Sequence, residues 1–179
     1  MSEFLTTKSR IGQTSIEGYW YTLDNQLYKD YDGCIYLTPR NTFTDGYTIP
    51  AIFHPIAGDN FNHDLRACTQ HDYECVYHKA LKVNLSVFQL RQMELLRYKG
   101  NMTICEDIPL KYIEIIDTSF NDTNARFRRM LDCLENMSEW QKVIIGNAVN
   151  FNLMWLFSKR ELHTDLIYQF DYEQLIKGF

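Results

Sequence analysis

Four residues of the types that hold protons or metals recur at helical spacing between positions 68 and 78. Cys68, His71, Cys75 and His78 are separated by steps of three, four and three, which places them on one face of a helix. Asp72 lies next to His71, about 100° round the helix axis. An imidazole oriented by a carboxylate is a common general base, so this segment predicts a site centred on His71.

A loop before this segment supplies a second carboxylate. Within Thr44–Pro50, the Asp-Gly pair favours a turn and the proline restricts the end of the loop. The Asp45 carboxylate and the Thr48 hydroxyl are therefore expected to point in defined directions, and His54 follows closely enough to reach the same place. We expect Asp45 to accept a hydrogen bond from His71 and so to join the loop to the helix.

The residues alone leave three interpretations open. Zinc requires about four nitrogen or sulfur ligands around one ion, and a single helix cannot converge this stripe on one point, so no metal site is predicted. In an enzyme, His71, Asp45 and Asp72 would be catalytic. In a binding or structural protein, a buried histidine would be satisfied by a carboxylate. The remaining candidate binding residues are Thr48, His54, Cys75 and His78. No cofactor is expected, and the alternative is a divalent metal ion near Asp72.

The two motifs together resemble a family of short phage and prophage proteins, the domain-of-unknown-function family 1353. Its signature is Thr-Asp-Gly-x-Ser-Ile-Pro, followed by a helix that carries His-Asp-x-x-Tyr. The matching residues are Thr44, Asp45, Gly46, Thr48 in place of serine, Ile49, Pro50, His71 and Asp72. Cys75 stands where that family commonly has tyrosine. The resemblance covers roughly residues 18–98 and implies a phage-encoded protein of the host cytoplasm or the virion.

A looser similarity links Cys68-Thr-Gln-His71-Asp72 to phospholipase A2, whose helix carries Cys-x-x-His-Asp with a histidine base and a calcium-binding aspartate. This similarity covers only those residues. The glycine-rich calcium loop of that family is absent from the sequence, and the cysteine spacing does not fit its disulfides. We interpret the match as coincidence or as a shared way of placing a His-Asp pair.

The elements that must position these motifs change in character near residue 60. Before it, Ser15–Leu23 and Cys34–Thr38 are rich in β-branched and aromatic residues and are separated by turns, which predicts a small antiparallel β meander. After it, the pattern is mainly helical. The expected fold class is α+β in a single domain spanning residues 1–179, with 1–60 mainly β and loop and 61–179 mainly helical.

Capping residues and apolar spacing predict four helices after residue 60. Their expected ranges are 60 or 62 to 82, 87 to 99, 123 to 136, and 138 to about 160. The segment Pro109–Ile116 fits a strand and a helix equally well. The apolar and aromatic tail Leu166–Phe179 is expected to dock on the protein or on a partner.

Charge and composition exclude several classes of protein. The formal net charge is −5, which argues against a non-specific nucleic-acid binder, and Arg126, Arg128 and Arg129 are expected on a solvated helix face. No apolar run approaches the ~18 residues of a membrane span. The first residues lack the apolar stretch of a signal peptide, so we expect an intracellular chain whose five cysteines are reduced.

Two functions fit these observations. The first is a non-enzymatic phage protein, either a tail, neck or capsid-associated virion component or a binder of a host factor. Its partners would be phage or host proteins or a second copy of the chain. The aromatic content of 15% favours this function, because tyrosine-rich surfaces are common at interfaces. The second is a small phage hydrolase with His71 as base and Asp45 and Asp72 as its partners. A buried and fully bonded His71 would favour the first.

Overall fold

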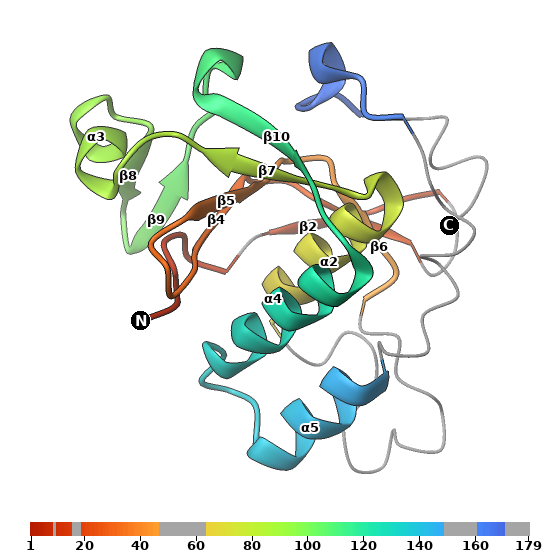
Figure 1. Ribbon diagram of the computed structural model, residues 1–179. Coiled ribbons are helices and arrows are strands. Elements are labelled where there is room, and N and C mark those ends of the chain that lie inside the picture. The colour runs from red at the N-terminus through yellow and green to blue at the C-terminus, as the bar shows by residue number, and fades with distance from the viewer. Residues whose placement is uncertain (9, 16–18, 47–63, 149–160, 171–179) are drawn as a thin grey trace.

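The computed structural model describes residues 1–8, 10–15, 19–46, 64–148 and 161–170 (Figure 1). The largest sheet has five antiparallel strands in the order β1-β4-β5-β7-β10. These strands are β1 (Glu3–Phe4), β4 (Gln26–Lys29), β5 (Ile35–Thr38), β7 (Lys79–Val83) and β10 (Ile113–Asp117). Because β7 and β10 come from beyond residue 60, this sheet joins the two parts of the chain.

Two smaller antiparallel sheets complete the β structure of the described residues. The first has the order β2-β3-β6, from β2 (Ile11–Gln13), β3 (Trp20–Thr22) and β6 (Phe43–Thr44). The second is a hairpin of β8 (Leu96–Lys99) and β9 (Met102–Cys105). Strand β6 bears directly on the site, because its last residue, Thr44, immediately precedes Asp45.

Four helices of at least six residues lie among the described residues. They are α2 (Arg66–Tyr77), α3 (Val87–Gln92), α4 (Phe120–Asp132) and α5 (Glu139–Ala148). Helix α2 packs against strands β5, β6 and β7 on one side and against α4 on the other, and α5 packs on α4 (Figure 1). Short 3-10 turns occur at Leu110–Tyr112 and Thr164–Leu166.

Helix α2 is enclosed along almost its whole length, since every residue from Ala67 to Tyr77 is buried. A helix that is buried all round is normally apolar. This one instead buries five polar or charged side chains: Thr69, Gln70, His71, Asp72 and Glu74. Each of them needs a partner inside the protein, because a buried polar group without one costs free energy.

The structure confirms the α+β class, with antiparallel sheets formed by the N-terminal strands and helices in the C-terminal half. Strand β5 matches the strand expected over 34–38, and β3 lies within the strand expected over 15–23, of which 16–18 fall outside the described residues. The capping box at Ser138 begins α5 as expected, with the Gln141 N–H donating to Ser138 Oγ at 3.3 Å. The continuation of that helix beyond residue 148 lies outside the described residues.

Two expected helices end early because strands follow them. Helix α2 ends at Tyr77, where His78 adopts a left-handed φ of 52°, and the expected continuation to residue 82 is instead β7. Helix α3 ends at Gln92, and the expected continuation to residue 99 is instead β8. Both continuations are short runs whose periodicity does not separate strand from helix, so pairing with neighbouring strands decides their conformation.

Helix α4 begins earlier than expected, because Ser119 rather than Thr123 caps it. Ser119 Oγ accepts a hydrogen bond from the N–H of Asp122 at 3.1 Å. The Asp122 carboxylate in turn accepts one from the Ser119 N–H, which completes a capping box. The helix ends at Asp132 instead of about residue 136. The ambiguous segment 109–116 forms a 3-10 turn followed by β10.

The start of the C-terminal tail packs on the body of the protein, as expected. The Tyr168 hydroxyl donates to the carbonyl oxygen of Ile108 at 2.9 Å, and the Ile167 side chain is buried. Residues 171–179 of the tail lie outside the described residues. Over the part of the chain that the structure describes, no helix combines the length and apolarity needed to cross a membrane.

Candidate functional site

The His71 side chain is enclosed between α2 and α4. Only 3% of the residue is exposed to solvent. Its Nε2 atom donates to Asn124 Oδ1 at 3.0 Å, and its ring packs on the ring of Phe127 with centroids 4.7 Å apart. Helix α4 therefore covers the ring and occupies one of its nitrogens, and no face of the imidazole is open to a substrate.

The other ring nitrogen of His71 faces Asp72 and Cys75. Nδ1 lies 3.8 Å from Asp72 Oδ1 and 3.8 Å from Cys75 Sγ. Burial by itself lowers the pKa of His71, but Cys75 and the Asp72 carboxyl raise it, and the net pKa lies well above the ordinary value. A general base must be unprotonated at the working pH, so this environment opposes that role for His71.

The hydrogen bond that joins the loop to the helix involves Thr44 and Asp72. Thr44 Oγ1 donates to Asp72 Oδ2 at 2.6 Å and accepts the N–H of Gly46 at 2.9 Å. The expected bond between Asp45 and His71 is not formed. Each of the two bonded residues is the sequence neighbour of the one predicted, and residues 47–50 of the predicted loop lie outside the described residues.

Asp45 follows Thr44 in the sequence and has a carboxyl oxygen without a partner among the described residues. Its Oδ1 atom is buried and makes no hydrogen bond to any described residue. Burial, and then the charge of Asp72, raise the pKa of Asp45 from 3.8 to about 7, and His71 offsets only part of the rise. Asp45 is therefore held largely as the neutral acid below neutral pH.

A second pair of opposite charges is buried one turn further along α2. Arg126 Nη1 contacts Glu74 Oε2, and Gln70 Nε2 donates to Glu74 Oε1 at 3.0 Å. The Arg126 guanidinium also lies over the Tyr36 ring, 4.1 Å from its centroid. Arg126 is thus 5% exposed and internal, and the prediction of a solvated face was wrong for this residue.

Arg129 also departs from that prediction. Its Nη2 atom contacts Asp30 Oδ2 at 2.6 Å, and the carboxyl of Asp30 is 3% exposed. Arg128 reaches the carbonyl oxygen of Gly146 at 3.3 Å, so it links α4 to α5. Arg126 and Arg129 therefore serve contacts within the protein, whereas Arg128 is exposed as predicted, although its guanidinium also contacts α5.

These residues form one connected group around α2, which we call the α2 polar cluster: Thr44, Asp45, His71, Asp72, Glu74, Asn124 and Arg126. The group contains three acidic and two basic side chains. Two pairs of opposite charge can be drawn, His71 with Asp72 and Glu74 with Arg126. Asp45 is the acid left over, which agrees with its raised pKa.

The other predicted site residues lie in different surroundings. Thr48 and His54 fall outside the described residues. Cys75 is fully buried, with Sγ 3.6 Å from His71 Nε2. His78 ends α2 through its backbone, because its N–H donates to the Glu74 carbonyl at 2.9 Å and its own carbonyl accepts from Thr118 at 3.1 Å.

Sequence reasoning missed the cluster residues of α4 and the partner role of Thr44. Asn124 and Arg126 are separated from α2 by about 50 residues, and they look like the polar positions of an ordinary amphipathic helix. The only local signal was the excess of polar residues on α2 itself, which had to find partners somewhere.

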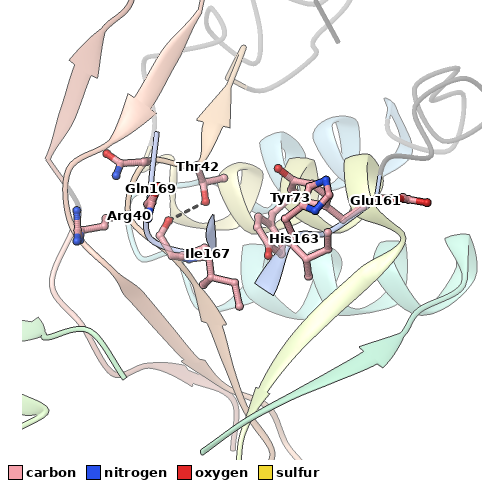
Figure 2. A pocket seen from close by; sticks show the side chains of 11 residues that line it. Arg40, Thr42, Tyr73, Glu161, His163, Ile167 and Gln169 are labelled. Carbon is pink, nitrogen blue, oxygen red and sulfur yellow. Dashed lines mark hydrogen bonds between the residues drawn. The ribbon is translucent and has the colours of Figure 1, made fainter. Parts of the chain in front are cut away.

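A small pocket lies on the opposite side of α2 from His71. Tyr73, two positions after His71 and thus on the other face of the helix, lines it together with Thr42, Arg40 and His163 (Figure 2). Its volume is about 30 Å³, which is room for one or two water molecules. The Tyr73 hydroxyl is buried without a hydrogen-bond partner among the described residues. None of Asp45, His71 and Asp72 lines this pocket.

A search of the described residues finds no group of three or more histidine, cysteine and acidic side chains placed to hold a metal ion. Within the α2 polar cluster, the Asp72 carboxyl is already engaged by Thr44 and faces His71.

Comparison of the chain with protein-family models, with curated proteins and with solved structures gives no match. The resemblance to the domain-of-unknown-function family 1353 therefore stays a prediction from the two motifs.

Proposed function

We propose that this chain is a phage-encoded protein that acts by binding other proteins and not by catalysis. In this proposal it is a virion component or a binder of a host factor, located in the host cytoplasm or the virion. Its α2 polar cluster is a structural clasp that joins the loop after β6, helix α2 and helix α4. The phage origin rests on the motif resemblance, and the non-enzymatic role rests on the surroundings of His71.

The enclosure of His71 is the observation that carries the proposal. The ring is 3% exposed, bonded to Asn124 and covered by Phe127, and its raised pKa favours the protonated form. A catalytic base needs both a free ring nitrogen and access to a substrate. A histidine that is internal, charged and paired with a carboxyl instead holds packed elements together.

Exposed aromatic side chains support a binding role. Phe88 and Trp140 are each 75% exposed and Tyr98 is 71% exposed, on α3, α5 and β8 respectively. Large aromatic residues at the surface are enriched in protein–protein contacts, where burying them contributes most of the binding free energy.

The alternative is a small phage hydrolase in which His71 is the general base with Asp45 and Asp72. One observation favours it. Asp45 has a buried carboxyl oxygen that no described residue bonds to, and its pKa is raised to about 7 by burial and by the nearby Asp72. A carboxyl group whose pKa is raised by burial and by a second carboxyl carries acid–base chemistry in several enzymes.

Hydrolysis assays on a His71→Gln variant separate the two functions. The purified chain would be offered fluorogenic esters, phosphodiesters, peptides and glycosides, with His163→Gln as a matched control at an exposed histidine. We expect the same background rate for all three chains. Turnover that disappears in His71→Gln alone, while the unfolding midpoint stays unchanged, would support the hydrolase and overturn the proposal.

Cross-linking tests the binding role directly. The tagged chain would be cross-linked in host cells during phage growth, and the linked peptides would be identified by mass spectrometry. We expect reproducible links to one or more phage or host proteins, or to a second copy, with links reduced by Trp140→Ser or Phe88→Ser. A chain that links to nothing beyond what an unrelated tagged protein captures would contradict the binding role.

A further inference from the structure

Helix α3 packs against strand β8 of the β8–β9 hairpin, and among the described residues only β9 pairs with β8. The hairpin lies with α3 at one end of the molecule, away from α4 and α5 (Figure 1). On the outer side of β9, the Thr7 N–H donates to the Thr103 carbonyl at 2.9 Å, and the Thr103 N–H donates to Thr7 Oγ1 at 2.7 Å. Cys105 of β9 forms a further bridge with Asn25. Strand β8 is therefore the edge strand.

The register of the hairpin decides which backbone groups β8 leaves open. Tyr98 lies opposite Thr103, and Thr103 uses its N–H and carbonyl on the side away from β8. In an antiparallel pair, opposing residues both point these groups inward or both point them outward. The N–H and carbonyl of Tyr98 therefore face away from β9, and no described residue bonds to them.

The same end of the molecule carries exposed apolar and basic side chains. Phe88 and Tyr98 are 75% and 71% exposed, and Met93 is 41% exposed. Between residues 87 and 105 there are three basic residues and one acidic residue, in a chain whose net charge is −5: Arg91, Arg97 and Lys99 against Glu94. Arg97 is paired with Glu106, which leaves Arg91, Glu94 and Lys99 as exposed charges, two basic and one acidic.

We propose that the outer edge of β8 binds an extended, acidic segment of a partner protein as an added antiparallel strand. An open strand edge offers the main-chain bonds of such a complex, and neighbouring side chains set its specificity. The basic surplus favours an acidic segment, and the exposed aromatic rings offer apolar contact. This inference rests on the proposed binding function and assigns that function a surface and a class of partner.

A second copy of the chain is a poor occupant of the same edge. If two β8 strands paired antiparallel about Tyr98, Arg97 of one copy would lie opposite Lys99 of the other. Like charges directly opposite each other destabilise a strand pair. The charge pattern therefore selects a different, acidic chain.

Labelled peptides test the proposal on the intact protein. The probe is a fluorescent peptide of about ten residues with alternating valine and glutamate, and binding is followed by fluorescence anisotropy. A peptide with lysine in place of glutamate is expected to bind about tenfold more weakly, or not at all. The acidic peptide N-methylated along its central residues keeps its charge but loses its donors, and we expect it to lose binding as well.

Two substitutions at one position separate the backbone from the side chain. Tyr98→Pro removes the outward N–H without removing a bond between β8 and β9, and should weaken binding of the acidic peptide about tenfold. Tyr98→Val keeps the N–H and the strand propensity, and should stay within about threefold of the unaltered chain. Circular dichroism and the unfolding midpoint test whether both variants fold. If Tyr98→Pro does not fold, the N-methylated peptide still tests whether binding needs main-chain hydrogen bonds.

Several outcomes would overturn the proposal. Equal binding of the acidic and N-methylated peptides would show that charge alone attracts them. Binding of a single-stranded oligonucleotide that is lost in Tyr98→Val would point to base stacking on the ring. No binding of any peptide, with partner cross-links that map to α5, would reject the β8 edge and leave the proposed function intact. An absence of cross-linked partners altogether would instead reject the function.

Discussion

Replacing Asp45 with asparagine should stabilise the protein at neutral and higher pH. Asp45 Oδ1 is buried without a hydrogen-bond partner among the described residues, and Asp72 and its negative charge lie nearby. Asparagine has nearly the shape of the neutral acid and cannot ionise. The substitution therefore removes the cost of forming a third carboxylate in a cluster that holds only two basic groups, His71 and Arg126.

The magnitude follows from the pKa. Unfolded Asp45 ionises near 3.8 and folded Asp45 near 7. The pKa rises by roughly three units, and each unit corresponds to about 1.4 kcal/mol. Asp45 therefore lowers the free energy of unfolding by at most about 4 kcal/mol. Because the folded state holds the proton more tightly, Asp45 contributes no penalty below about pH 4. The free energy of unfolding falls as the pH rises from about 4 to about 7, and above about 7 the contribution of Asp45 stays level.

Urea unfolding of the unaltered and Asp45→Asn chains at pH 5 and pH 8 measures this effect. Asp72 and Glu74 also have raised pKa values and weaken the fold in the same direction, but they are present in both chains. We expect the variant to gain about 2–4 kcal/mol at pH 8 and roughly a third to a half of that at pH 5. Glu135→Gln, at an exposed carboxyl, should change neither value. Equal loss of stability in Asp45→Asn at both pH values would refute the reasoning, because it would mean that Asp45 is ionised and paired.

Three further substitutions test other contacts. Arg126→Met leaves the Glu74 carboxylate buried without its partner and should lower the free energy of unfolding by about 3–5 kcal/mol in urea. The double variant with Glu74→Gln should recover most of this loss, and failure to do so would speak against a specific pair. Asn124→Ala removes the acceptor of the His71 bond and should cost about 1–3 kcal/mol, measured by the thermal midpoint; an unchanged midpoint would contradict the enclosure of the ring. Ser119→Ala removes the cap of α4 and should cost about 1 kcal/mol by the same measurement, with Ser119→Asp as the control that keeps a cap.

Local sequence predicted the elements that depend on local interactions. The steps of three and four residues between Cys68 and Cys75 indicated a helix, and α2 spans that segment. The capping box at Ser138 indicated the start of α5 and is formed as expected. These features need only neighbouring residues, so their outcome does not depend on the rest of the fold.

Local sequence failed where neighbouring strands compete with a helix. Residues 79–83 and 96–99 looked like helix continuations, but the first pairs with β5 and β10 and the second with β9. The free energy of those pairings comes from residues far away along the chain, and it outweighs the small difference in local preference.

The sequence by itself determined that a histidine, an aspartate and two cysteines share one helix beside an Asp-Gly loop. Only the tertiary structure decided what that arrangement holds. Asn124, 53 residues after His71, occupies the ring nitrogen, and Thr44 takes the place predicted for Asp45. The reason is burial. Once α4 covers the helix, each polar side chain must find a partner within the protein, and the choice of partner and protonation state depends on which distant groups pack there.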